Sequence, residues 1–180
     1  MQSHTSKERD KGMEGAGLQW EKYMEEALKE AEKARERDEV PVGCVIVDAN
    51  GDIKGRGFNR PIAEKDPTAH AEIIAIREAC IRAKNYRLSR CFLVSTVEPC
   101  LMCVGAIVHS RIEGVVFGCR DEKAGALLSR LSPEELRWLN HKFWIREGIL
   151  KERCRKLLQN FFKEKRRQKK KVRRGTEARS

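Results

Sequence analysis

The chain has 180 residues, of which 36% are charged, and a formal net charge of +11. This length favours one domain with tails. The sequence has neither an apolar run long enough to span a bilayer nor a charged-then-apolar leader, so we expect a cytoplasmic protein without a membrane association. Seven cysteines, an odd number, are typical of a reducing compartment. The basic excess favours nucleic acid as a partner, although a solvated basic surface would give the same charge.

The N-terminal third predicts a helix followed by a pair of strands. Residues 1–17 are polar and lack a period, so we expect a disordered extension there. Apolar residues then recur at helical spacing from residue 18 or 20 to residue 34. Residues 40–48 have the pattern of a buried strand, and Asn50-Gly51 predicts a hairpin turn into a returning strand over 53–58.

The rest of the chain alternates helices and strands, which predicts an α/β architecture with a central sheet and helices on its faces. We expect a helix over 69–83, a strand over 91–96, a helix opened by Pro99, a strand over 114–119, a loop with short helical pieces over 120–139, a short strand over 143–145 and an amphipathic helix over 152–162. From residue 163 to 174 the sequence is almost wholly basic. We therefore place one domain at 18–165 and a basic tail at 166–180.

Five residues form the pattern H-x-E … P-C-x-x-C: His70, Glu72, Pro99, Cys100 and Cys103. One imidazole and two thiolates suit a tetrahedral zinc ion whose fourth position stays open. The alternative is that the His and the Cys pair are buried core residues. The proline before the first Cys and the carboxylate two residues after the His favour a catalytic metal site.

The ligand set indicates the chemistry. Zinc lowers the pKa of a bound water from about 16 towards about 7, which gives a nucleophile at neutral pH. Glu72 is placed to take the proton of that water and to deliver it to a ring nitrogen and to a departing amine. Such a site suits hydrolysis at an amidine-like carbon that carries an NH2 group, and the same signature is that of zinc deaminases acting on nucleic-acid bases.

Longer motifs narrow the resemblance. They are EVPVGCVIVD, FNRPI, DPTAHAEI, NYRL, VEPCLMC, HSRI, VVFGCRDEKAG and LNHK. With these the chain resembles the bacterial-type tRNA-specific adenosine deaminases of the cytidine deaminase superfamily, over about residues 20–165. The resemblance implies a three-layer cytidine deaminase-like fold, with a mixed five-stranded sheet and helices on both faces. It also implies one zinc ion per subunit, a homodimer, and hydrolysis of adenosine to inosine at wobble position 34 of a tRNA anticodon stem-loop, with arginine tRNA as the expected substrate.

The family's residue roles carry over to matching positions. His70, Cys100 and Cys103 match the zinc ligands, Glu72 the proton shuttle, Asn59 and Asn140 the asparagines that hold the flipped nucleotide, Asp121 and Lys123 a loop beside the RNA, and Phe162 an aromatic near the RNA-contacting C-terminal helix. An amide suits base edges because it offers both donors and acceptors. The alternatives are a turn role for Asn59, a solvated loop at 121–123, and core packing of Phe162 beside Phe161.

Two other functions stay open at this point. A deaminase of a free base or nucleoside, such as cytosine, guanine or cytidine, would use the same metal site. A non-catalytic RNA-binding subunit could keep zinc for structure, although intact Glu72 argues against it. Residues 126–130 and 133–135 also depart from the family, which usually has a small-residue stretch and a Pro-Gly turn there, so the rim of the pocket or the dimer surface is expected to differ.

Overall fold

The computed structural model describes residues 17–132 and 134–177. For residues 172–177 it describes the backbone alone. The predicted N-terminal extension therefore lies, except for Gly17, outside the described residues. In chain order the elements are α1 (Trp20–Glu36), β1 (Gly43–Asp48), β2 (Ile53–Phe58), α2 (Pro61–Glu64), α3 (Ala71–Ala83), β3 (Cys91–Val97), α4 (Leu101–Ser110), β4 (Gly114–Cys119), β5 (Trp144–Glu147) and α5 (Lys151–Glu177). The alternation of helices and strands is as the sequence predicts.

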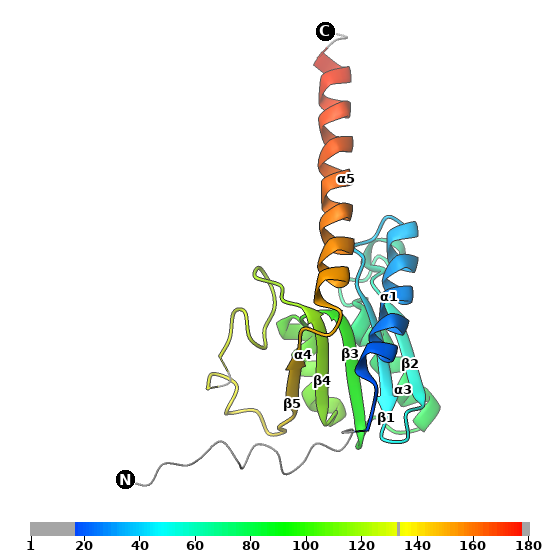
Figure 1. Ribbon diagram of the computed structural model, residues 1–180, viewed down its shortest axis with the longest axis vertical. Coiled ribbons are helices and arrows are strands. Elements are labelled where there is room, and N and C mark those ends of the chain that lie inside the picture. Colours follow the sequence, from blue (N-terminus) through cyan, green and yellow to red (C-terminus); the bar gives the residue numbers. More distant parts are fainter. Residues whose placement is uncertain (1–16, 133, 178–180) are drawn as a thin grey trace.

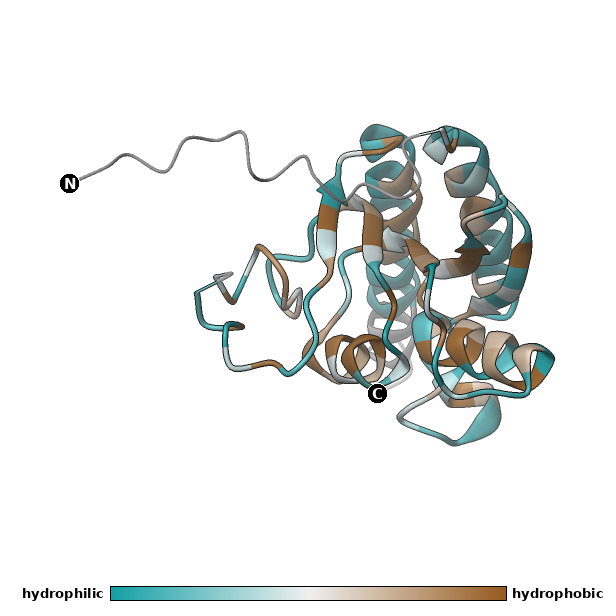
Figure 2. Cartoon of the chain, turned by 90° about the horizontal axis from the view of Figure 1, so that it is seen from below, coloured by the Kyte–Doolittle hydropathy of each residue, from teal (hydrophilic) through white to brown (hydrophobic). Residues whose placement is uncertain are grey.

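The five strands form one mixed sheet in the order β2-β1-β3-β4-β5. β1 is antiparallel to both β2 and β3, whereas β3, β4 and β5 are parallel. Helices α1 and α5 cover one face of the sheet, and α3 and α4 cover the other (Figure 1). Figure 2 shows hydrophobic residues on the strands and on the helix surfaces around them. The three-layer fold is confirmed.

The core lies on the central strands. Val45, Val94 and Val116 are paired across β1, β3 and β4, and all three are fully buried. Strands buried on both faces are expected to be continuous apolar runs rather than alternating ones, as β1, β3 and β4 are. The cluster ends in an aromatic group in which the Trp20 ring lies 5.6 Å from the rings of both Phe92 and Trp144, centre to centre.

Two glycines bring α3 against β2. A Cβ atom on Gly55 would lie 2.1 Å from the carbonyl oxygen of Ala75, and one on Gly57 would lie 2.1 Å from that of Ala71. Only residues without a side chain permit such a close approach of two backbones. The contact fixes the start of α3, which is where the H-x-E part of the motif lies.

The structure differs from the sequence prediction in three places. β1 begins at Gly43 rather than at residue 40, because Pro41 has no N–H to give to the ladder. The short helix α2, which begins at Pro61, is not among the elements that the sequence predicts. The described part of 120–139 forms turns in place of the expected helical pieces. There the N–H groups of Leu127 and Leu128 bond to a distant carboxylate, Glu98, so they are not available to a helix.

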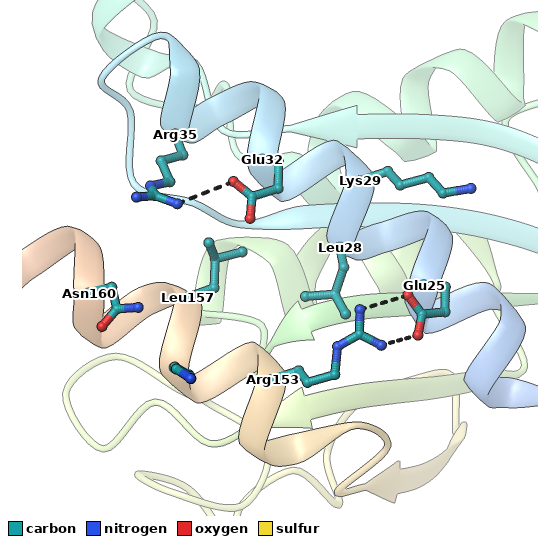
Figure 3. A pocket seen from close by; sticks show the side chains of 9 residues that line it. Glu25, Leu28, Lys29, Glu32, Arg35, Arg153, Leu157 and Asn160 are labelled. Atoms are coloured by element: carbon teal, nitrogen blue, oxygen red, sulfur yellow. Dashed lines mark hydrogen bonds and ion pairs between the residues drawn. The ribbon is translucent and has the colours of Figure 1, made fainter.

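Helix α5 continues without a break from the domain into the predicted basic tail. Charged pairs join it to both halves of α1 and to the turn after it: Arg153 with Glu25, Arg35 with Glu164, and Lys165 with Asp38. Figure 3 shows the first of these, beside Leu28 and Leu157 in a shallow groove between the two helices. Beyond these pairs α5 extends past the rest of the chain (Figure 1). Among the described residues, none of the helices has both the length and the apolar character needed to cross a bilayer.

Candidate metal centre and active site

The two halves of the motif lie at the starts of α3 and α4. His70 is the residue that caps α3, and Cys100 is the residue that caps α4. The sequence predicts that Pro99 is the first residue of α4, but this helix begins two residues later, at Leu101. The carbonyl of Pro99 accepts the N–H of Ala126 instead of an N–H of the helix. The N-terminal ends of helices carry partial positive charge, which stabilises a thiolate or a carboxylate placed there.

The donor atoms of His70, Cys100 and Cys103 surround one point. The Nδ1 atom of His70 lies 3.6 Å from the Sγ atom of Cys100 and 3.7 Å from that of Cys103, and the two sulfurs are 3.6 Å apart. Tetrahedral zinc, with bonds of about 2.3 Å to sulfur and about 2.0–2.1 Å to nitrogen, places neighbouring donors about 3.6–3.8 Å from one another. The three residues therefore fit a zinc ion that keeps one position open for a water molecule or a substrate.

The two thiols are already different in acidity. The hydrogen bond from Cys103 lowers the pKa of Cys100 to about 4, and the same contact raises the pKa of Cys103. Zinc binds the thiolate form of cysteine, so its binding displaces protons from the site.

Glu72 lies in the first turn of α3, and its carboxyl group is buried against the ligands. Its Oε2 atom is 3.5 Å from the Sγ atom of Cys103. Burial raises the pKa of Glu72, and the neighbouring charge of Cys100 adds to the shift. A buried carboxyl with a raised pKa, placed beside but outside the ligand set, has the position and the acidity expected of a proton shuttle.

Asn59 lies next to the metal ligands and holds the start of α3. Its side-chain Oδ1 atom accepts a hydrogen bond of 2.9 Å from the N–H of Ala71, and its backbone N–H donates to the carbonyl of Val42 at 3.1 Å. The side chain is buried. Because the oxygen of the amide is used by α3, it is the NH2 end that a bound nucleotide could engage.

Asp121, Lys123 and Phe162 line one groove of about 570 Å³ between the segment after β4 and α5. The groove is lined by Val40, Val42, Val97, Cys119, Arg120, Asp121, Glu122, Lys123, Arg155, Leu158, Gln159, Phe162 and Arg166. Phe161 takes the core position, and Phe162 is 41% exposed. Two lining residues of the groove are directly connected to the site. The carbonyl of Val42 accepts the N–H of Asn59, and Val97 precedes the ligand Cys100 by three residues.

Asn140 is not brought to the metal ligands within one chain. Its carbonyl and its Oδ1 atom lie 3.0 Å and 3.4 Å from the guanidinium of Arg111. Arg111 caps the C-terminal end of α4, while Cys100 is at the other end. A helix of this length spans about 15 Å, so a role of Asn140 in the nucleotide pocket stays a prediction.

The sequence analysis missed two buried polar residues that support the site. Ser95 on β3 is fully buried and donates to the Oε1 atom of Glu72 at 3.3 Å. Glu98 is also buried and accepts several backbone N–H groups from the segment after β4. A signal for Ser95 was present, since Ser95 and Thr96 interrupt an otherwise apolar strand.

Comparisons with known proteins agree with this geometry. Residues 18–119 match the family model of the cytidine and deoxycytidylate deaminase zinc-binding region. The chain is 47% identical over 150 residues to the tRNA-specific adenosine deaminase of Haemophilus influenzae, covering 83% of this chain and 87% of that one. It is 45% identical over 158 residues to the Bacillus subtilis protein of the same name, covering 86% and 96%.

A solved structure from work on A-to-I editing by tRNA:A34 deaminases at the wobble position of transfer RNA superposes with a TM-score of 0.73. That structure is 39% identical in sequence, and the match covers 76% of this chain and 99% of the other. The chain therefore matches the zinc-binding region of the deaminase family and shares most of its fold with this solved structure. The chain belongs to the zinc-dependent cytidine and deoxycytidylate deaminase family, within its group of tRNA-specific adenosine deaminases.

Proposed function

We propose that the chain hydrolyses adenosine to inosine at position 34 of a tRNA anticodon, with arginine tRNA as the substrate to test first. The observation that carries the proposal is the position of Glu72, whose carboxyl group is buried beside a three-donor zinc site without being one of the three donors. The overall reaction consumes one water and releases one ammonia. All seven cysteines are free thiols, as is usual in the reducing cytoplasm, where we place this activity.

The roles of the chain's own residues follow from their positions. Zinc held by His70, Cys100 and Cys103 would supply a water molecule with a pKa of about 7. Glu72 accepts the proton of that water on a carboxylate oxygen and delivers it to the N1 atom of adenine. The carboxylate then takes the second proton of the water from the new C6 hydroxyl and passes it to the amino group, so that the C6–N bond breaks and ammonia leaves. The hydroxyl of Ser95 donates to the carboxyl group of Glu72 and so keeps that carboxyl group turned towards the site during both proton transfers.

The groove gives the RNA a place beside this centre. Arg155, Gln159, Phe162 and Arg166 lie at helical spacing on one face of α5, opposite Asp121 and Lys123. The exposed ring of Phe162 can stack on a base, and the guanidinium groups can contact phosphates. A loop nucleotide is already unstacked, so its extrusion into the site costs little compared with opening a duplex.

The basic part of α5 prolongs this surface. Lys163, Arg166, Arg167, Lys169, Lys170 and Lys171 are exposed on the helix where it leaves the body of the protein (Figure 1). Arg166 belongs to the groove itself. Charges on a rigid helix at this position suit the phosphates of the anticodon stem, which would orient the RNA without reading its sequence.

We also propose that the chain forms a homodimer through α4. Leu101 is 61% exposed and Met102 is 37% exposed, and a Cβ atom on the nearby Gly105 would meet open space. An apolar helix face of this kind is typical of a contact surface. Because Leu101 follows the ligand Cys100, a second copy would lie next to the metal centre.

Sedimentation at micromolar concentration tests the dimer. The wild-type chain should sediment as a dimer and a Leu101→Glu variant as a monomer, while Ile81→Glu, on an exposed apolar residue of α3, should leave the dimer intact. A monomeric wild type would contradict the proposal.

The activity is tested with purified, zinc-loaded chain and an anticodon stem-loop of arginine tRNA carrying A34. We expect inosine at position 34 only, and none in a stem-loop with G34. Free adenosine and free cytidine should react far more slowly than the stem-loop. Efficient turnover of a free base or nucleoside, with none of the RNA, would favour the alternative function and overturn this one.

A further inference from the structure

Glu98 lies between β3 and α4, and its buried carboxylate is surrounded by hydrogen-bond donors. The Oε1 atom accepts the backbone N–H groups of Leu127, Leu128 and Ser129 at 3.0, 2.7 and 3.0 Å. The Oε2 atom accepts the N–H of Asp121 at 3.2 Å and the hydroxyl of Ser129. Three successive N–H groups that point at one oxygen form an anion-binding concavity, here filled by the chain's own side chain.

The residues that follow Glu98 are attached to the same segment. The carbonyl of Pro99 accepts the N–H of Ala126 at 2.9 Å, and Cys100 forms an isolated bridge with Gly125. A Cβ atom on Gly125 would lie 2.4 Å from the carboxyl group of Glu98, so only glycine fits there. Residues 121–129, which we name the rim segment, are therefore wrapped around the short stretch that ends in a zinc ligand.

The rim segment also carries residues predicted to contact RNA. The carboxylate of Asp121 accepts the N–H of Lys123 at 2.9 Å and that of Ala124 at 3.3 Å, which closes a turn. The carboxylate of Glu98 accepts the N–H of Asp121, which is the first residue of this turn, and the N–H groups of residues 127–129, which follow the turn. A shift of the Asp121 backbone would therefore move Lys123 with it and change the wall of the groove.

We infer that Glu98 is a positioning residue that fixes the rim segment, and with it the RNA-facing side chains of Asp121 and Lys123, relative to the zinc ligand Cys100. The inference rests on the proposed function for its effect on RNA, but the geometry stands without it. Glu98 does not reach the reacting atoms. Its contribution is to keep the RNA-contacting wall and the metal centre in one fixed relation.

The variant Glu98→Gln tests this most sharply. The single oxygen of the amide can serve the three N–H groups of 127–129, but its NH2 group then faces the N–H of Asp121, donor against donor. We expect the KM for the stem-loop to rise about tenfold, the size expected when one charge-assisted hydrogen bond is lost. The turnover number at saturating RNA and the zinc content should stay close to wild type.

Two further variants separate positioning from general stability. Ser129→Ala removes one donor from the carboxylate and should raise KM less than Glu98→Gln does. Glu113→Gln is the matched control, because Glu113 likewise accepts a backbone N–H, that of Arg90 at 2.8 Å, but at the opposite end of β4. This control should leave KM unchanged.

Hydrogen exchange gives a readout that needs no activity. In Glu98→Gln the amides of the rim segment, Asp121 above all, should exchange faster while those of β3 stay protected. An unchanged KM together with unchanged exchange at Asp121 would overturn the inference, and so would a loss confined to zinc content and melting temperature. A wild-type chain that fails to deaminate the stem-loop would instead overturn the proposed function, with the exchange result still deciding the role of Glu98.

Discussion

His70 and Cys100 occupy equivalent positions in two different helices. Each caps its helix, and the carbonyl of each accepts the first intrahelical hydrogen bond, from Ile74 at 3.0 Å and from Val104 at 2.9 Å. The Nδ1 atom of one and the Sγ atom of the other are 3.6 Å apart. The metal centre is thus built where two helix N-termini meet, on segments whose backbones are fixed by regular structure.

Glu72 should be required for turnover but not for zinc binding. Because its carboxyl lies beside the ligands and outside their set, Glu72→Ala should keep zinc and RNA binding but lose turnover by at least about 10²–10⁴-fold. Single-turnover assays measure the turnover, metal analysis measures the zinc content, and titration with the stem-loop measures the RNA affinity. Glu78→Ala, further along the same helix, is the control and should retain most activity. Substantial residual turnover in Glu72→Ala would rule out the role of proton shuttle.

A ligand variant should behave differently. Cys103→Ala leaves two protein ligands, which rarely hold zinc, so we expect loss of the metal and a lower melting temperature. Cys80→Ala, which removes a free thiol outside the site, should keep one zinc ion per chain. Full zinc occupancy in Cys103→Ala, measured by metal analysis, would contradict the ligand assignment.

Asn59 has a structural and a proposed binding role that two substitutions can separate. Asn59→Ala removes the acceptor for the N–H of Ala71 and should lower the free energy of unfolding by about 1 kcal/mol, as for the loss of a helix cap. Asn59→Asp keeps that acceptor but loses the NH2 group. It should therefore melt near wild type and yet bind the stem-loop poorly. Equal RNA affinity of Asn59→Asp and wild type would limit Asn59 to holding α3.

The basic end of α5 should act on RNA binding alone. Removing every residue after Lys165 keeps the described pairs between α5 and the α1 region. The KM should rise and the salt dependence of binding should flatten, by a little under about one unit of log–log slope for each lost phosphate contact. The turnover number should change little.

A charge control accompanies the truncation. Replacing Arg82, Lys84 and Arg87 by Gln removes positive charge at the far end of α3 and should leave the slope nearly unchanged. A truncated chain with the wild-type salt slope would indicate that the tail is solvated and makes no phosphate contact.

The metal ligands and Glu72 could be predicted from sequence because their spacing is local and their chemistry is specific. His70 and Glu72 are two residues apart, and Cys100 and Cys103 are three apart. The apolar runs of β1, β3 and β4 are likewise visible, since strands buried on both faces are mostly apolar, and in β3 only Ser95 and Thr96 interrupt the run. Both kinds of feature depend on near neighbours in the chain.

The features that sequence reasoning missed depend on distant partners. The N–H groups of Leu127 and Leu128 bond to Glu98, about thirty residues earlier, so a segment with helical composition forms turns. Ser95 acquires its role from Glu72, on a different element. The placement of Asn140 likewise depends on a distant partner. Its carbonyl accepts a hydrogen bond from Arg111 at the C-terminal end of α4, away from Cys100, and a motif match does not reveal this.

In the proposed mechanism, Glu72 and a zinc ion held by His70, Cys100 and Cys103 deaminate A34 by hydrolysis. The most direct measurement incubates the zinc-loaded chain with the A34 stem-loop in water enriched in heavy oxygen, followed by mass spectrometry of the released nucleosides. We expect the wild type to form inosine that carries the heavy isotope at oxygen 6, and we expect chelation of zinc to abolish this reaction. Unmodified adenosine with the loaded wild type, or inosine formed equally well by Glu72→Ala, would contradict it.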